Sequence, residues 1–146
     1  MPHVTLPISS PGGPILDLGI AVSEPHERAL RAANKPVPPP VRIRALVDTG
    51  ASGTCVDPTC LKSLGLTSKG QTPIRTPSTG ATPHFCDQYD VSIILLHKSI
   101  TLRLAAVPII ASDLAIQGIQ ALLGRDVLSR CLLVYDGSAG SFTLSF

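Results

Sequence analysis

The segment Ala-Leu-Val-Asp-Thr-Gly-Ala-Ser, residues 45–52, places a carboxylic acid at the end of an apolar run. Apolar residues occupy every second position from 41 to 47, a pattern typical of a β-strand with one packed face. Gly50 then permits a tight turn, and the hydroxyls of Thr49 and Ser52 can hydrogen-bond to nearby groups. We therefore expect the turn to present the carboxylate of Asp48, which suits this group to proton transfer.

A second segment, Ala-Leu-Leu-Gly-Arg-Asp-Val-Leu at residues 121–128, accompanies the first. Together the two segments resemble the retroviral-type (retropepsin-like) aspartic peptidases over roughly residues 41–146. The resemblance implies an all-β fold: one domain over residues 1–146, built as a single-lobe acid-protease β-barrel with one or two short helices. It also implies that Asp48 is catalytic and that Thr49, Gly50 and Ser52 support it.

The chemistry of the resembling family requires two acids. One carboxylate takes a proton from water while a neighbouring carboxylic acid donates a proton to the scissile carbonyl, without a metal or a covalent intermediate. Two carboxyl groups that lie so close share one proton, because they cannot both ionise comfortably. A single catalytic aspartate per chain therefore needs a partner.

The chain does not offer that second acid in a matching motif. The segment Ser-Thr-Gly-Ala-Thr at residues 78–82 has a serine where the acid would stand. Asp136 follows an apolar run, but Asp-Gly between two strand-like segments predicts a hairpin turn. We therefore expect a two-fold homodimer that brings Asp48 of each copy to the symmetry axis.

Length and composition agree with this reading. The 146 residues (15.2 kDa) suffice for one domain and are too few for the two lobes of pepsin-like single-chain enzymes. Hydrophobic residues make up 44% and charged residues 15%, so a core can form and some apolar surface can remain for a partner. A net charge of +2 and only 3% aromatic residues give no basis for nucleic-acid binding.

The sequence predicts no membrane segment and no secretory signal in this chain. The longest apolar tract, residues 104–111, is far shorter than a membrane span and contains a proline. No basic region followed by a continuous apolar run stands after Met1. We expect a cytoplasmic protein, or a soluble part of a longer membrane-anchored one.

Cys55, Cys60, Cys86 and Cys131 show no paired Cys-x-x-Cys spacing, so we expect free buried thiols and no disulfide framework. His84 could form half of a metal site with Cys86, or a thiol-protease pair with Cys55 or Cys60. No signature supports either role. We therefore expect neither a metal nor a cofactor.

The segments before the first motif are expected to form its scaffold. They are a strand at residues 3–8, a strand at 15–23, a helix or loop at 24–34 and a stiff proline-rich connection at 36–40.

After the first motif, Asp57, Pro58 and Gly65 mark the start and the end of a short packing helix. The later segments comprise strands at 91–96 and 100–104, the turn at 97–99 that joins them, and a surface loop at 109–120.

Residues 71–90 contain three prolines and several small polar residues. In the resembling family a β-hairpin flap in this stretch closes over the substrate, and by position Ser78, Thr79 and Gly80 form its tip. A lid must open to admit a peptide and shut to exclude water, and small residues at a tip suit that motion. An ordinary polar loop is the alternative.

Gly124 allows close packing where a side chain would obstruct the active-site loop, and a short helix follows at residues 126–130. In retroviral enzymes the arginine that matches Arg125 pairs with an acid shortly after the active-site glycine. Here Ala-Ser-Gly at residues 51–53 offers none. We therefore expect Arg125 to be structural, bonding backbone carbonyls or the partner chain.

The chain ends in an alternating polar and apolar segment. A terminal strand with an apolar face needs a partner, and in the resembling family the chain termini interleave across the dimer axis. We therefore expect Phe142, Leu144 and Phe146 at the dimer interface, together with Val4 and Leu6. The alternative is a strand that packs on the core of its own chain.

These patterns predict a homodimeric aspartic endopeptidase that cleaves a protein or peptide substrate without a cofactor. Two other classes stay open. One is a dimeric interaction module that keeps the protease fold with little or no turnover. The other is a monomeric β-barrel that binds a small ligand.

Overall fold

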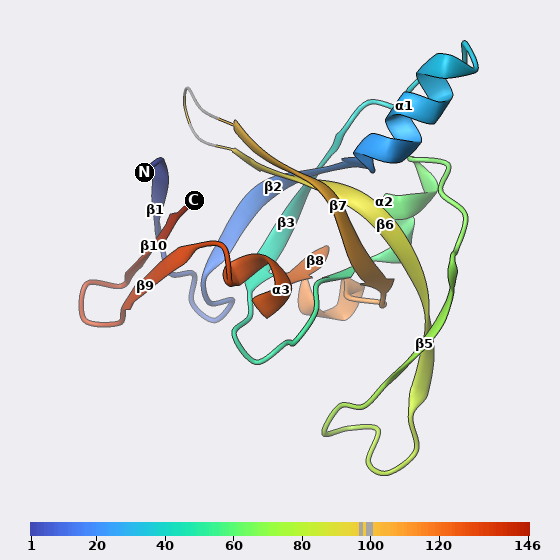
Figure 1. The fold of residues 1–146 in the computed structure, drawn as a ribbon. Helices are drawn as coiled ribbons and strands as arrows, with labels where there is room; N and C mark the ends of the chain where they lie inside the picture. The colour runs from blue at the N-terminus through green and yellow to red at the C-terminus, as the bar shows by residue number, and fades with distance from the viewer. Residues whose placement is uncertain (97, 99–100) are drawn as a thin grey trace.

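The computed structural model describes residues 1–96, 98 and 101–146, and its strands form two sheets (Figure 1). The strands are β1 (His3–Pro7), β2 (Ile15–Val22), β3 (Val41–Val47), β4 (Cys55–Val56), β5 (Gly70–Ile74), β6 (His84–Leu96), β7 (Thr101–Ala111), β8 (Ala121–Leu123), β9 (Leu132–Asp136) and β10 (Ser141–Ser145). The helices are α1 (Glu24–Ala32), α2 (Pro58–Lys62), α3 (Arg125–Leu128) and the 3₁₀ helix η1 (Ala115–Gln117).

The larger sheet closes into a barrel. Its strand order is β2-β3-β8-β4-β7-β6-β5, and an additional pairing between β2 and β6 joins the two ends of the first six strands. Alternate residues of β3, namely Ile43, Ala45 and Val47, are buried inside it. The parallel pairing of β3 with β8 places the two sequence motifs side by side. The all-β, single-lobe barrel is therefore confirmed.

The described residues form three short α-helices, more than the one or two that the sequence predicted. The additional helix is α1, in the segment for which the sequence pattern predicts either a helix or a loop. Its start is capped by Ser23 Oγ, which accepts the N–H of His26 at 3.4 Å. Glu27 joins it to the barrel through Arg103 of β7, with 2.7 Å between Oε2 and Nη2.

Strand β7 extends beyond its predicted end. It runs through Pro108, which lies opposite Asp90 of β6, and it ends at Ala111. Val107 and Ile109 are buried on one face, so inward packing maintains the strand past the proline. The predicted loop therefore begins later and contains η1. In the predicted β6–β7 connection, residues 97, 99 and 100 lie outside the described part of the chain.

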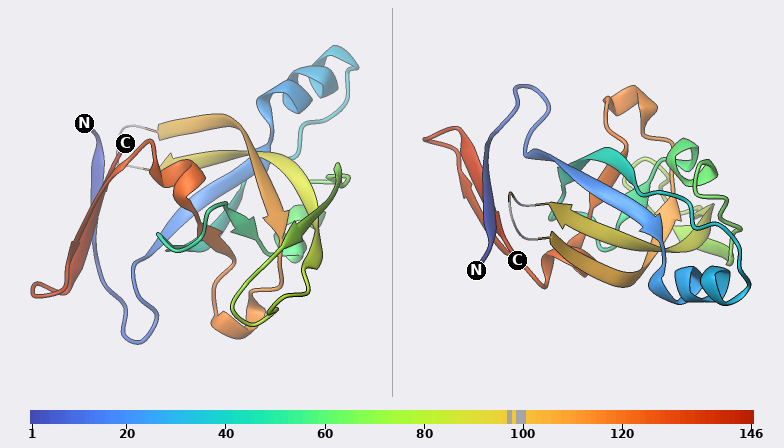
Figure 2. Two further views of the ribbon diagram at one scale, coloured as in Figure 1. Left: turned by 60° about the horizontal axis from the view of Figure 1, so that its bottom comes forward. Right: turned by 90° about the horizontal axis from the view of Figure 1, so that it is seen from above.

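The smaller sheet, in the order β1-β10-β9, lies at one side of the barrel and contains both chain termini, whereas α1 lies at the other side (Figure 2). Because β10 pairs with β1 on one edge and β9 on the other, Phe142 (1% exposed) and Leu144 (0%) pack in the core of their own chain. This burial within one chain favours the alternative, a strand packed on its own core, and the place of these two side chains at a dimer interface stays a prediction. Phe146 remains half-buried.

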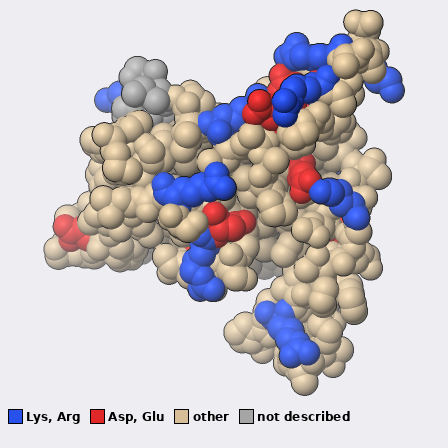
Figure 3. All heavy atoms as spheres, in the orientation of Figure 1, with Lys and Arg blue, Asp and Glu red and all other residues tan. Residues whose placement is uncertain are grey.

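Charged side chains of both signs are interspersed on the face seen in Figure 3, most densely over α1. There Glu27 pairs with Arg31 and Arg103, and hydrogen bonds from these two arginines lower the pKa of its carboxyl group. Across the described ranges, no helix has the length and apolar character needed to cross a membrane.

Candidate active site

Asp48 lies in the turn directly after β3 and is half-buried. Its backbone N–H donates to the carbonyl oxygen of Leu123 in β8 at 3.0 Å, which fixes the end of the strand. Its Oδ1 accepts the N–H groups of Gly50 at 2.9 Å and Ala51 at 3.3 Å. Oδ2 accepts no hydrogen bond from the residues that the structure describes. One carboxylate oxygen is thus anchored by backbone, and the other is available for proton transfer.

Backbone groups hold this turn more than the predicted hydroxyls do. Gly50 supplies its N–H, and a Cβ added there would stand 3.1 Å from Asp48 Oδ1. Thr49 contributes its carbonyl oxygen, which accepts a hydrogen bond from Nη1 of Arg125 at 3.1 Å. Thr49 and Ser52 are both exposed, and neither hydroxyl bonds to any residue within the described ranges. The hydrogen bonds predicted between these hydroxyls and nearby groups are therefore not observed within the described ranges.

Gly124, at the start of α3, packs against the loop that follows Asp48. A Cβ added to Gly124 would lie 2.5 Å from both the carbonyl carbon and the carbonyl oxygen of Gly53. The backbone φ of Gly124 is −86°, which any residue can adopt. Glycine is therefore needed here because there is no room for a side chain, and not because of the backbone conformation. The next N–H, that of Arg125, donates to the carbonyl oxygen of Ala51 at 2.9 Å. Helix α3 and the Asp48 turn are therefore joined backbone to backbone.

Arg125 reinforces the same junction. Its side chain is exposed, and its guanidinium bonds the Thr49 carbonyl, which is one of the two roles that the sequence suggested. No ion pair joins Arg125 to an acid within the described part of the chain, in agreement with the missing acid at residues 51–53. The arginine thus ties the turn to α3 through a carbonyl oxygen.

A buried clamp between Thr54 and Asp126 links the two motifs. Thr54 is 1% exposed. Its hydroxyl donates to Asp126 Oδ1 at 2.7 Å and accepts the N–H of Gly124 at 3.1 Å, while its own N–H donates to Asp126 Oδ2 at 3.0 Å. Sequence patterns place Asp126 only at the start of the predicted helix at residues 126–130 and assign no role to Thr54. The two residues are 72 positions apart, so no local pattern joins them.

Thr54→Val tests this clamp. The substitution keeps the side-chain volume but removes the hydroxyl from the half-buried Asp126 Oδ1, which keeps only the Val127 N–H, and leaves the buried Gly124 N–H without a partner. We therefore expect a loss of about 2–4 kcal/mol in the free energy of unfolding. Thr54→Ser keeps the hydroxyl and loses a methyl group, so we expect the free energy of unfolding to fall by about 1 kcal/mol. Chemical denaturation measures both values. Equal losses in the two variants would show that the hydroxyl does not hold the motifs together.

Other acids of the chain have structural hydrogen bonds. Asp57 caps α2, as predicted, with Oδ1 accepting the Thr59 N–H at 2.9 Å, and its Oδ2 accepts the Leu114 N–H at 3.1 Å. Hydrogen bonds from Thr59, chiefly that of its side chain, lower the pKa of Asp57, and the Leu114 N–H contributes. Asp136 lies at the predicted turn, where its Oδ1 accepts the Ala139 N–H at 2.9 Å. That bond, together with one from Ser138, lowers the pKa of Asp136.

The cysteines do not have the properties of nucleophiles. Burial raises the pKa of all four thiols: Cys55, Cys60, Cys86 and Cys131. For Cys55 the negative charges of nearby groups, Asp48 among them, add to the effect of burial. A raised pKa keeps a thiol protonated, whereas a thiol nucleophile needs a lowered one. Among the described residues, no group of three His, Cys, Asp or Glu side chains is placed to hold a metal ion.

The three predicted flap residues lie at the end of a β-hairpin. Strands β5 and β6 pair from Gly70 opposite Gln88 to Ile74 opposite His84, and residues 75–83 connect them. This hairpin extends away from the barrel (Figure 1).

In the connection, Thr79 donates its N–H and its hydroxyl to the carbonyl oxygen of Thr76, both at 3.0 Å. Gly80 follows with a φ of +60°, which glycine adopts readily. Ser78 is exposed and Thr79 is half-buried. Their role as a substrate flap stays a prediction.

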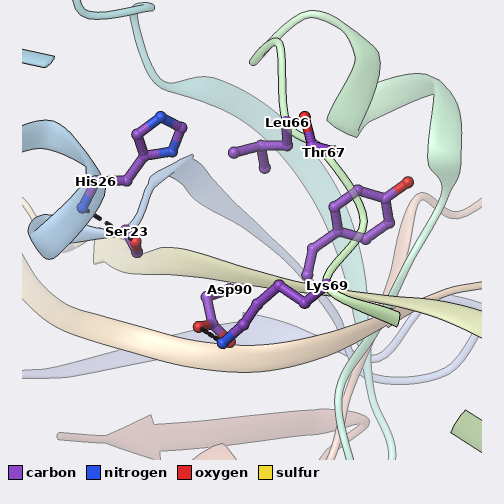
Figure 4. Close-up of a pocket in the computed structure, with 7 residues that line it drawn as sticks. Ser23, His26, Leu66, Thr67, Lys69 and Asp90 are labelled. Atoms are coloured by element: carbon purple, nitrogen blue, oxygen red, sulfur yellow. Dashed lines mark hydrogen bonds and ion pairs between the residues drawn. The ribbon is translucent and has the colours of Figure 1, made fainter. Parts of the chain in front are cut away.

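A separate hollow of about 260 Å³ lies between α1 and the base of this hairpin (Figure 4). The Lys69 ammonium and the Asp90 carboxylate point toward each other there and form an ion pair. The hydroxyl of Ser23 is engaged in the cap of α1. Three of the polar side chains that line the hollow, those of Ser23, Lys69 and Asp90, are therefore bonded to the protein itself.

A family model described as an aspartyl protease matches residues 40–127, a stretch that contains Asp48 and nearly all of the second motif. No curated protein matches the chain. Among solved structures, the chain is similar to the crystal structure of a retropepsin-like aspartic protease from Rickettsia conorii. The TM-score is 0.61 and the sequence identity is 18%, with 99% of this chain and 90% of that chain covered. At this level of identity the likeness shows a shared fold.

Proposed function

We propose, since the chain belongs to the aspartyl protease family, that two copies of it form an aspartic endopeptidase to which each copy contributes its Asp48. The observation that supports this best is the state of that carboxylate. Its Oδ1 is anchored by the Gly50 and Ala51 N–H groups, and its Oδ2 has no hydrogen-bond partner among the residues described. An oriented carboxylate with one uncommitted oxygen is what a water-activating base needs.

The hydrogen bonds of the other acids support a second copy as the source of the second carboxyl group. Both oxygens of Asp126 bond to Thr54, and both oxygens of Asp57 accept backbone N–H groups. Asp136 is engaged in the turn between β9 and β10. None of these three acids follows a barrel strand in an Asp-Thr-Gly turn. A two-fold axis beside Asp48 supplies the missing acid by symmetry.

In the proposed reaction, the ionised member of the pair takes a proton from a water molecule, and the water oxygen attacks the scissile carbonyl carbon. The protonated member donates its proton to the carbonyl oxygen, which yields a tetrahedral intermediate. The member that took a proton from water then donates it to the amide nitrogen as the peptide bond breaks, and the other member takes a proton from a hydroxyl of the intermediate, so the pair again shares one proton. The Gly50 and Ala51 N–H groups keep the orientation of Asp48 through these steps. The proposal involves no cofactor.

The β5–β6 hairpin is proposed to cover the bound peptide, with Ser78, Thr79 and Gly80 at the tip. Its connection is closed by its own hydrogen bonds, and it extends away from the barrel (Figure 1). A hairpin of this kind can shield the reacting groups from bulk water when a substrate is present.

The test is to incubate the purified protein with a diverse peptide library at acidic to neutral pH and to vary the chain concentration. We expect new peptide termini, and a rate per chain that rises with concentration until dimers are saturated, because dilution separates the two acids. Peptide binding without new termini would favour the interaction module. Monomer mass at every concentration with no cleavage would favour a ligand-binding barrel.

A further inference from the structure

The outward face of the small sheet is apolar only along β9. Thr5 of β1, Thr143 of β10 and Val134 of β9 lie in one cross-strand row. They lie on the face opposite Phe142 and Leu144, because side chains alternate along a strand. Thr5 and Thr143 join their hydroxyls at 2.8 Å, as suits a face in water. On β9, by contrast, Val134 is 49% exposed and Leu132 is 56% exposed.

Strand β9 is also an open edge. In the order β1-β10-β9 it has a neighbour on one side only, within the described residues. An edge strand leaves backbone N–H and C=O groups free to pair with another strand. The opposite edge, β1, ends at Pro7, which has no N–H to donate, whereas β9 contains no proline. Of the two edges, β9 is therefore the better template for pairing.

An open hollow connects this edge with the catalytic turn. It measures about 310 Å³ and is lined by Thr49, Arg125, Leu128, Ser129 and Leu133. Thr49 follows Asp48 directly, and Leu133 belongs to β9. An axis that brings two Asp48 residues together must pass beside Thr49, so a second copy must also cover this hollow.

We propose that two copies pair through β9, antiparallel to each other, so that their three-stranded sheets become one continuous sheet across the two-fold axis. A two-fold axis makes such a contact self-complementary, with Val134 of one copy near Val134 of the other. The inference rests on the proposed function, because the shared pair of acids sets the axis beside Asp48. The occupant is a second copy because the site is incomplete without one. The contact differs from interleaved termini, since β1 and β10 already pair within one chain.

Val134→Glu tests the edge, and Thr5→Glu is its matched control. Both positions lie in the same cross-strand row and on the same face, at opposite edges of the sheet. Val134→Glu places two carboxylates close together at the axis, so we expect the dissociation constant of the dimer to rise at least about 100-fold. Thr5→Glu should change it by less than about threefold. Sedimentation velocity over a range of chain concentrations measures both.

Val134→Thr covers the case in which the glutamate variant does not fold, because it keeps a β-branched side chain and adds one polar group. We expect this variant to keep the far-ultraviolet circular dichroism of the original chain and to raise the dissociation constant about 3- to 10-fold.

Dissociation by Thr5→Glu but not by Val134→Glu would place the contact at β1 and overturn the inference. An original chain that is monomeric at every concentration would also overturn it. A dimer that Val134→Glu separates, but that cleaves no peptide, would support the β9 contact while the proposed function fails. Cleavage by the original chain together with an intact Val134→Glu dimer would leave the proposed function standing and refute the β9 contact.

Discussion

Asp48→Asn is expected to abolish peptide cleavage, lowering kcat/KM by roughly 10⁴-fold. Asparagine keeps a side-chain carbonyl oxygen that can accept the Gly50 and Ala51 N–H groups, so the turn should persist. It replaces the uncommitted oxygen with an amide nitrogen, which cannot take a proton from water. In a homodimer both members of the pair are lost at once. Folding and dimer formation should therefore be largely unchanged while chemistry stops, and an assay with a cleaved library peptide measures the loss.

The control for this variant is Asp113→Asn. Asp113 is exposed, and its one bond to the described residues joins Oδ1 to the Ala115 N–H at 3.1 Å. We expect its kcat/KM to stay within about threefold of the original chain, because Asp113 is an exposed charge, screened by solvent, that takes no part in the proposed pair of acids. Unchanged cleavage by Asp48→Asn would refute the proposed mechanism.

Mixing the original chain with the Asp48→Asn variant tests whether the two catalytic acids come from different copies. When Asp48→Asn is added in about ninefold excess and the copies exchange, roughly one tenth of the original chains find an intact partner. We therefore expect activity to fall about tenfold, because a mixed dimer holds one catalytic carboxyl group where the mechanism needs two. Undiminished activity after verified exchange would mean that one chain suffices.

The parts of the site that the sequence predicted are those with local signals. A two-residue period up to Val47 defines a strand with one buried face, and Asp-Thr-Gly at its end defines a turn. The cap at Asp57 and the turn at Asp136 follow from the same kind of local chemistry, and both were correct. These features depend on residues only a few positions apart, so the sequence shows them directly.

The parts that the sequence missed depend on contacts between distant segments. Thr54 meets Asp126 because β4, which follows Thr54 directly, pairs antiparallel with β8 inside a closed barrel, and nothing near either residue specifies that pairing. The alternating pattern through Phe142 and Leu144 showed that one face must be covered. It could not show that β1 and β9 of the same chain flank the strand. Periodicity thus identifies a buried face without naming the neighbour that covers it.

Gly124 shows the same difference between local and distant information. The sequence predicts that this glycine allows close packing against the active-site loop, but only the folded barrel shows which atoms lie beside it. Gly124→Ala should lower the free energy of unfolding by about 3 kcal/mol, because the added Cβ overlaps backbone atoms that cannot rotate away. The overlapped atoms are the carbonyl carbon and oxygen of Gly53, at 2.5 Å.

Activity should suffer as well as stability. To restore ordinary contact, α3 and the loop after Asp48 must separate by about 1 Å, and a displacement of this size at a catalytic group can lower kcat/KM about 100-fold. The bonds at stake include Arg125 N–H to Ala51 O (2.9 Å) and Gly124 N–H to Thr54 Oγ1 (3.1 Å). Chemical denaturation and peptide cleavage measure the two losses separately.

Gly53→Ala is the matched control, because it adds the same methyl group on the other side of the same contact. A Cβ added to Gly53 would have no other atom within 4 Å. We therefore expect the free energy of unfolding to fall by less than about 1 kcal/mol and kcat/KM to change only slightly. Equal damage by both variants would mean that the loop tolerates no side chain at all, whatever the space. Full activity in Gly124→Ala would mean that α3 can move without disturbing Asp48. Damage by Gly124→Ala alone would establish that close backbone contact between the two motifs positions the catalytic carboxylate.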